Sequence, residues 1–276
     1  MSAPRPQLSR LTEGPRRPLT RLDRVLGVAG YFATVSLRTW RSWVVSRFVQ
    51  PVFFVLAMGF GVGGLVDRSS GGVGGVPYLS YVAPGLLMAS VMQWATSEST
   101  WPVMTLLKWN QLYVAMLAAP NRVGDLILGH WLVICTGIAG GAAVFVGVTG
   151  ALGAVVSWWS LLAILWAVLL ALAFITPLFW VASVATNEEH FSTIFRLVVT
   201  PLMLFSGTFF PISQLPTVLQ VIAWATPLSH GTELARAAFL GAPLPPGWAG
   251  HVTVLVLYAV AGAVFARRAL ARRLET

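Results

Sequence analysis

The sequence predicts an all-α, polytopic membrane protein with six transmembrane helices, and three observations lead to this fold class. Of the 276 residues, 57% are hydrophobic and 10% are charged, whereas a soluble domain carries about 25% charged residues. The mean hydropathy is +0.77. Apolar stretches of about 20 residues recur along the chain, and a helix of that length crosses the hydrocarbon core of a bilayer.

The N-terminal region divides into two parts. Residues 1–19 are polar, rich in Arg and Pro, and contain no apolar stretch, so we expect a disordered cytoplasmic tail and no cleaved signal peptide. Residues 20–47 alternate apolar side chains with arginines at helical spacing, and Trp40 and Trp43 suit the depth of lipid headgroups. This pattern predicts an amphipathic helix on the inner membrane surface, with its arginines against anionic lipid.

Six spans follow. They cover residues 48–66, 81–106, 127–149, 158–184, 194–210 and 250–265. A flexible Gly/Ser-rich loop is expected at residues 67–77. No internal repeat and no second domain is evident, so residues 20–268 are assigned to one transmembrane domain and residues 269–276 to a cytoplasmic tail.

The placement of arginines orients the chain. If the N-terminus is cytoplasmic, all of the 18 basic residues except Arg68 and Arg236 lie on the cytoplasmic side. Cytoplasmic loops generally carry an excess of Arg and Lys, so both termini are expected inside the cell. The net charge of +9 does not indicate a nucleic-acid-binding protein, because the basic residues gather at the ends of the spans.

The segment at residues 205–241 begins as the end of an apolar span and then breaks at Pro211, Pro216 and Pro227. Apolar residues between the prolines recur at helical spacing, which predicts short amphipathic pieces at the outer membrane face. Lipid cannot satisfy free backbone groups, so the segment must be buried in protein or face water. We expect an outer, re-entrant segment between spans five and six.

The connection between spans two and three, residues 106–129, predicts a short helix at the inner membrane face. Leu112, Met116 and Ala119 share one side of this helix, and Pro120 ends it. The neighbouring aromatic residues could fill a groove in a partner protein. The alternative is an interfacial helix without a partner.

Glu98 is the notable charge within a span. A carboxylate at membrane depth is costly, so it should face the helix bundle and have a partner. Arg41 or Arg47 could reach it from the cytoplasmic side. Such a group could act in gating or line a substrate path. The alternative is a structural ion pair, or a protonated carboxyl bonded to a hydroxyl.

Motifs of catalysis and metal binding are missing from the sequence. It contains no GxxxxGK[ST] phosphate loop, no HExxH, no GxSxG and no cysteine pair, since Cys135 is the only cysteine. The four histidines lack the spacing of metal ligands. We therefore expect neither an enzyme nor a bound cofactor in this chain.

Two segments of the chain resemble ABC-2 type export permeases. In the outer segment the similar residues are the run SGTFFP at 206–211, the pair Leu215-Pro216, the run PLSH at 227–230, and Arg236. In the inner connection they are Tyr113, Leu117, Pro120, Asp125 and Gly129. The resemblance is strongest to the lipooligosaccharide (nodulation-factor) and daunorubicin-type exporters, and it covers nearly the whole chain.

This resemblance implies the permease subunit of an ATP-driven exporter in the bacterial cytoplasmic membrane. Two permeases, identical or homologous, would pair with two copies of a separate ATPase chain that binds ATP and Mg. The expected cargo is amphipathic, lipid-linked, a glycolipid or drug-like, because the path has aromatic walls. The alternatives are a membrane scaffold or assembly protein without a transport cycle, and a secondary transporter.

The resemblance also assigns roles to residues. The N-terminal amphipathic helix corresponds to the elbow helix. Glu233 and Arg236 fall in the outer re-entrant region, with a plain surface pair as the alternative, and an apolar outer gate is expected at Phe205, Phe209 and Phe210. The inner connection corresponds to the coupling helix that docks on the ATPase, and its candidate contacts are Trp109, Tyr113, Met116, Leu117, Pro120 and Asp125.

Overall fold

The structure, a computed structural model, describes residues 19–39, 41 and 49–274. Helices make up 82% of it, and this part of the chain contains no strand, only one isolated bridge between Val73 and Val76. The prediction of an all-α fold is confirmed. Residues 1–18 of the tail expected at 1–19, the tryptophans Trp40 and Trp43, and Arg47 lie outside the described residues.

Within the described residues, four helices are long and apolar enough to cross a membrane: Val52–Ser70, Val123–Ala151, Trp158–Val184 and Trp248–Leu274. They coincide with four of the six expected spans. The other two expected spans, residues 81–106 and 194–210, also fall mainly in helices. The first of these helices carries too many polar residues to meet the same criterion, and the second is too short.

The first half of the chain contains two long interrupted helices and the amphipathic helix α1. The first long helix contains a π-helical stretch, and the second breaks at Thr100, just before Pro102, whose ring cannot continue the hydrogen-bond ladder. The elements are α1 (Arg21–Arg38), α3 (Gln50–Leu56), η3 (Ala57–Val62), α4 (Gly63–Ser70), α5 (Tyr78–Ser99), α6 (Trp101–Met104), η4 (Thr105–Trp109) and α7 (Leu112–Leu117).

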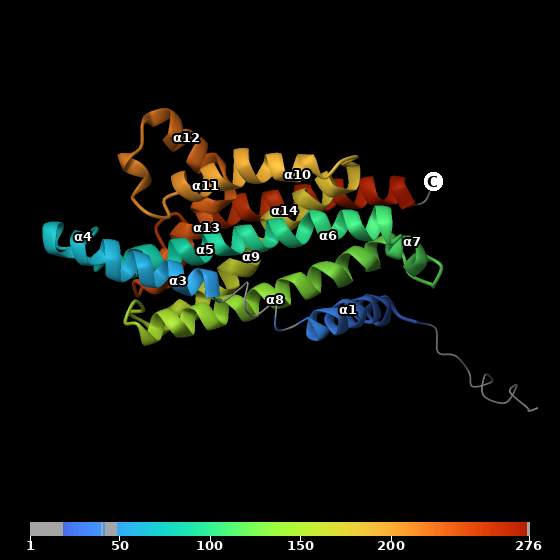
Figure 1. Ribbon diagram of the computed structural model, residues 1–276, viewed down its shortest axis with the longest axis horizontal. Coiled ribbons are helices and arrows are strands. Elements are labelled where there is room, and N and C mark those ends of the chain that lie inside the picture. The colour runs from blue at the N-terminus through green and yellow to red at the C-terminus, as the bar shows by residue number, and fades with distance from the viewer. Residues whose placement is uncertain (1–18, 40, 42–48, 275–276) are drawn as a thin grey trace, which may run out of the picture.

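The second half supplies the other long helices and the Pro-broken segment. Its elements are α8 (Val123–Ala151), η5 (Trp158–Leu161), α9 (Leu162–Val184), α10 (Glu189–Ile194), η6 (Phe195–Val199), α11 (Thr200–Phe205), η7 (Ile212–Gln214), α12 (Thr217–Ala225), α13 (Pro227–Phe239) and α14 (Trp248–Leu274). The long helices lie side by side. The C-terminus, α7 and the start of α10 gather at one end of the bundle, and α4 and α12 at the other (Figure 1). We call these the C-terminal end and the far end.

Helix α9 forms the centre of the bundle and packs against α5, α8, α13 and α14. Its closest contact is with α14 at Gly262. A Cβ atom built there would lie 2.5 Å from the backbone nitrogen of Pro177 and nearer still to the hydroxyl of Thr176. That hydroxyl also lies 2.9 Å from the carbonyl oxygen of Ala259. Only glycine permits this approach of the two backbones.

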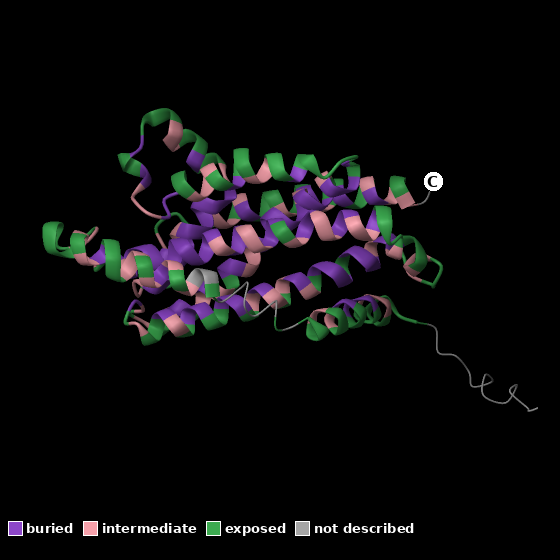
Figure 2. Cartoon of the chain, in the orientation of Figure 1, coloured by how far each residue is buried: buried purple, intermediate pink, exposed green. Residues whose placement is uncertain are grey.

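Helix α13 is buried inside the bundle, whereas α12 is mostly exposed (Figure 2). Leu228, Leu234 and Phe239 of α13 are fully buried. The amphipathic pieces expected between the prolines correspond to α12, whereas α13 is buried in protein, one of the two environments expected for this segment. The cause of this burial is its small residues, such as Gly231, which packs directly on Leu170 of α9 and lets α13 enter between α5, α9 and α14.

Helix α1 forms where the sequence predicts an amphipathic helix. Thr20 caps it, accepting a hydrogen bond from the backbone N–H of Asp23, whose carboxylate in turn accepts from the N–H of Thr20. Val28 and Phe32 are buried against α8, and the opposite face of α1 is exposed. Gly129 of α8 sits directly beneath Val28, where a larger residue would not fit.

Candidate functional site

The connection at residues 106–126 lies at the C-terminal end of the bundle and presents an apolar surface. The side chain of Trp109 is 53% exposed and that of Val114 is 49% exposed. We call this exposed patch the loop surface; its members are Trp109, Val114, Ala115, Ala118, Ala119 and Pro120. Large exposed apolar groups outside a lipid-facing span commonly mark a protein-binding site.

The six residues expected to couple to an ATPase separate into three groups. Trp109 and Pro120 are exposed, and Met116 and Leu117 are half-buried. Tyr113 and Asp125 are buried. The exposed and half-buried residues are accessible to a partner, whereas the buried pair contacts the rest of this chain.

Tyr113 connects the loop surface to the bundle. Its hydroxyl lies 2.6 Å from Nδ1 of His130 on α8, and burial raises the pKa of Tyr113, so the phenol stays protonated. The His130 ring is stacked on Phe32 of α1, with 4.0 Å between the ring centroids. A displacement of α7 would therefore be transmitted through these rings to both α8 and α1.

Asp125 holds α1 against the start of α8. Its Oδ2 accepts a 2.6 Å hydrogen bond from Nε of Arg24, and its Oδ1 lies 3.5 Å from Nε of Arg21. Oδ2 also accepts from the backbone N–H of Arg122, which caps α8. Arg24 was not expected as a partner from the sequence, although Arg24, Val28 and Phe32 recur at four-residue spacing on the buried face of α1.

A second connection reaches the C-terminal end beside the loop surface. Nζ of Lys108 donates a 3.1 Å hydrogen bond to the carbonyl oxygen of Thr186, just after α9. Glu188 and Glu189 follow at once and are exposed. The 106–126 connection is thus fastened to the turn between α9 and α10, and acidic side chains border it.

Glu98 lies in the wall of a cavity of about 1050 Å³ between α1, α5, η4 and α8. Leu37 and Thr39, close before Arg41, line the same cavity. The structure therefore brings Glu98 to the part of the chain that precedes Arg41. The expected pairing of Glu98 with Arg41 or Arg47 remains a prediction.

Arg236 connects α13 to α5 and to the segment that follows α11. Its Nη1 donates a 2.5 Å hydrogen bond to the Glu233 carboxylate, and its Nη2 donates a 2.5 Å hydrogen bond to the carbonyl oxygen of Gly207. The guanidinium also lies over the ring of Tyr81 on α5, 4.1 Å from its centroid. Because Arg236 is buried, the alternative of a plain surface pair does not hold. Gly207 has a φ of 78°, a left-handed conformation that favours glycine.

The three phenylalanines expected to form an outer gate point to different surroundings. Phe209 is half-buried and lies 6.1 Å from the ring of Phe54 on α3. Phe210 packs on a small separate cluster beneath α12, formed by Ile212, Leu215 and Ala223. Phe205 is 36% exposed. Phe209 therefore joins this segment to the first long helix.

A histidine pair on α13 and α14 was not anticipated from the sequence. Nδ1 of His230 lies 2.8 Å from Nδ1 of His251, and Nε2 of His230 lies 2.9 Å from the carbonyl oxygen of Trp224. A carbonyl only accepts, so Nε2 of His230 carries a proton, and Nδ1 of His230 accepts a hydrogen bond from Nδ1–H of His251. The two residues are 21 positions apart, and no sequence spacing signals their contact.

The polar and aromatic residues described above make contacts between helices. Within residues 19–39, 41 and 49–274, no group of three or more His, Cys, Asp or Glu residues converges to hold a metal ion. The contacts of Tyr113, Asp125 and Arg236 instead join short segments at the two ends of the bundle to the long helices. Such ties can transmit a movement from one end to the other.

Comparison with known proteins gives one family and a set of relatives. The family model for the ABC-2 type transporter matches residues 32–240. Nodulation protein J of Rhizobium leguminosarum bv. trifolii is 32% identical over 234 residues, which cover 84% of this chain and 86% of that protein. Nodulation protein J of Bradyrhizobium diazoefficiens is 31% identical over 83% of this chain and 86% of its own length. The capsule polysaccharide export inner-membrane protein CtrC of Neisseria meningitidis serogroup B is 38% identical over 61 residues, or 22% of this chain and 23% of its own length.

Proposed function

This chain belongs to the ABC-2 type transporter family, and from that membership we propose that it is the permease subunit of an ATP-driven exporter. It is a multi-pass membrane protein of the family, and the part of the chain that the structure describes contains four helices long and apolar enough to span a bilayer. The observation that supports the proposal most directly is the loop surface, an exposed apolar patch at the bundle end that carries the C-terminus.

We assign six spans to the chain and place both termini in the cytoplasm. The two additional spans are α5 with its continuation to η4, and α10 to α11. The placement of the arginines supports this orientation, because Arg267, Arg268, Arg272 and Arg273 lie at the C-terminal end. In this orientation the loop surface faces the cytoplasm of a bacterial cell, and α12 and α13 lie towards the outside.

The proposed complex contains two permeases and two copies of an ATPase chain that binds ATP and Mg. Nucleotide chemistry is assigned to that partner, because the sequence of this chain has no phosphate-binding loop. The loop surface would dock on the ATPase. Movement of α7 would then reach α8 and α1 through Tyr113, His130 and Phe32.

The proposed cargo is an amphipathic molecule such as a glycolipid or another lipid-linked compound. One relative supports a carbohydrate-containing cargo, since it is a capsule polysaccharide export protein. A scaffold protein without a transport cycle would lack ATP-dependent movement of cargo. A secondary transporter would function without an ATPase partner.

The test measures docking of the ATPase. The Ala119→Asp variant places a charge on the loop surface, whereas Ala225→Asp makes the same change at an exposed position of the far end. We expect Ala119→Asp to lower copurification of the coexpressed ABC ATPase by about tenfold or more, because a charge is desolvated in the interface. The Ala225→Asp variant should retain the ATPase. Equal retention by both variants would exclude the loop surface as the docking site.

A further inference from the structure

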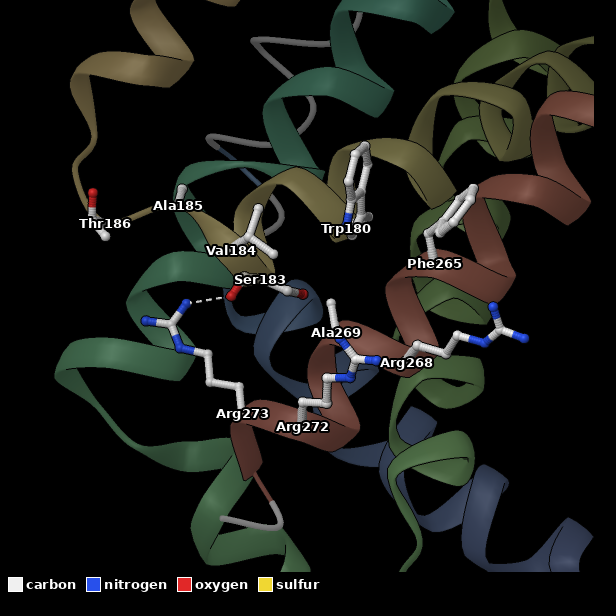
Figure 3. A pocket seen from close by; sticks show the side chains of 10 residues that line it. All are labelled: Trp180, Ser183, Val184, Ala185, Thr186, Phe265, Arg268, Ala269, Arg272 and Arg273. Carbon is white, nitrogen blue, oxygen red and sulfur yellow. Dashed lines mark hydrogen bonds between the residues drawn. The ribbon is translucent and has the colours of Figure 1, made fainter.

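A cavity of about 690 Å³ opens between the C-terminal ends of α9 and α14. Its wall combines aromatic and basic side chains: Trp180 and Val184 come from α9, and Phe265, Arg268, Ala269 and Arg272 come from α14 (Figure 3). None of these six residues belongs to the loop surface, although Thr186, which also lines the cavity, accepts the hydrogen bond from Lys108 described above.

Two contacts hold this cavity in shape. On one side of it, Gly262 brings α14 into direct contact with Thr176 and Pro177 of α9. On the other side, Nη1 of Arg273 donates a 2.6 Å hydrogen bond to the carbonyl oxygen of Ser183. That carbonyl lies in the last turn of α9, where backbone oxygens lack helical partners. The two helices are thus joined at both ends of the cavity.

The aromatic part of the cavity faces away from the bundle core. The rings of Trp180 and Phe265 lie 5.5 Å apart, and their side chains are 41% and 50% exposed. Both helices are long and apolar enough to span a membrane. Exposed aromatic rings close to the end of a span suit the boundary between acyl chains and headgroups.

The basic part of the cavity continues along the same side of α14. Phe265, Arg268 and Arg272 are spaced by three and four residues, which places them on one face of the helix. Among the described residues, no carboxylate lies within 4.0 Å of the Arg268 guanidinium. Guanidinium groups bind phosphate through paired N–H donors. An anion with an apolar tail matches both parts of this wall.

We propose that this cavity binds an anionic phospholipid. The phosphate lies on Arg268 and Arg272, and an acyl chain lies along Trp180 and Phe265. Basic pockets between transmembrane helices are suited to anionic headgroups. The site requires only that α9 and α14 cross the membrane, and the proposed orientation places it in the cytoplasmic leaflet.

The test uses Trp180 as the reporter, in the purified full-length chain reconstituted into nanodiscs. Bromine atoms on lipid acyl chains quench a nearby tryptophan, and the difference between the wild-type chain and Trp180→Phe isolates the Trp180 signal. We expect brominated phosphatidylglycerol to quench Trp180 at a mole fraction about tenfold lower than brominated phosphatidylcholine does. The Arg268→Gln/Arg272→Gln variant should lose this preference.

The matched control is Arg196→Gln/Arg267→Gln, which removes the same charge from two exposed positions outside the cavity. It should keep the preference for phosphatidylglycerol, and size-exclusion profiles should show all three proteins equally folded. Equal quenching of the wild-type protein by the two lipids would overturn the proposal. Loss of the preference in the control would also overturn it, because general surface charge would then explain the binding.

A further arm separates a lipid from a soluble phosphate. Inorganic phosphate and glycerol phosphate at millimolar concentration should not displace brominated phosphatidylglycerol from the wild-type chain. Displacement would assign the cavity to a soluble phosphate compound and overturn the lipid proposal. The measurement needs no ATPase and no cargo, so its result is independent of the exporter function.

Discussion

Tyr113 sits between a surface that a partner could reach and the interior of the bundle. Family resemblance marks it as a coupling residue, yet the structure buries it against His130. The sequence could not distinguish these positions, because Tyr113 and Val114 are neighbours on a short helix and only packing decides which one is exposed. Trp109 and Pro120 were predicted as contacts, and both are exposed.

The first prediction compares two variants of Tyr113. Tyr113→Phe removes the hydroxyl beside His130 and should cost about 1 kcal/mol of stability. Tyr113→Ala removes the buried ring and should cost about 3–5 kcal/mol. The measurement is the melting temperature of the purified chain, with Trp109→Ala as the exposed control. A melting temperature of Tyr113→Ala equal to that of the wild type would contradict the burial of this ring.

The second prediction concerns the histidine pair. Burial lowers the pKa of His230 below its ordinary value of 6.5, although the hydrogen bond to the Trp224 carbonyl raises it. A lowered folded-state pKa means that the unfolded chain binds more protons just below pH 6.5, so stability falls as the pH decreases through that value. The melting temperature of the wild-type protein should drop on acidification, and the melting temperature of His230→Asn should drop by less. Identical acid sensitivity of the two proteins would exclude this role of His230.

At the scale of single elements, helices α1 and α13 show what the sequence could and could not predict. The position of α1 and its apolar face followed from periodicity. Its tie to α8 did not, because Arg24 and Asp125 are 101 residues apart. For α13, the prolines predicted the breaks correctly. The helices that surround α13 were not predicted, because they are decided by the packing of the whole fold.

The third prediction tests the tie between α1 and α8. Arg24→Ala leaves the buried carboxylate of Asp125 without its nearest cation, and Asp125→Ala removes the carboxylate itself. Each variant should lower the melting temperature. The double variant should lower it by less than the sum, with a coupling free energy of about 1–3 kcal/mol. Strict additivity would mean that the pair does not hold α1 in place.

The fourth prediction tests the contact between α9 and α14. Gly262→Ala places a methyl group against the backbone of Pro177, so the two helices must separate. The same change at Gly250, on the same helix, meets no atom within 4 Å. Gly262→Ala should therefore lower the melting temperature and the yield of folded protein, and Gly250→Ala should preserve both. Equal behaviour of the two variants would argue against the close approach.

For the molecule as a whole, composition alone was enough to predict a helical membrane protein. Four of the six expected spans coincide with helices that meet the length and apolarity of a span. Residues 81–106 and 194–210 were harder to judge, because polar side chains and short helices weaken the signal of a span. Pairings across the bundle, such as His230 with His251, depend on the packing of the whole fold and leave no trace in local sequence.

The fifth prediction tests the orientation of the whole chain. In a background with Cys135→Ser, a cysteine at Ser70 lies at the far end and one at Ala118 lies on the loop surface, and both positions are exposed. A membrane-impermeant maleimide added to intact cells should label the first cysteine and not the second. Permeabilised cells should label both, which serves as the control. External labelling of Ala118→Cys would reverse the orientation and exclude cytoplasmic docking at that surface.

Lys108 gives the chain a reactive group at a useful position. It is the only lysine in the sequence, because every other basic residue is arginine. Its ammonium group is exposed beside the loop surface and bonded to the carbonyl of Thr186. Amine-directed acylating reagents therefore modify one side chain of the native protein, without any engineered substitution. The rate of that acylation reports directly on whether this corner of the molecule is covered by another protein.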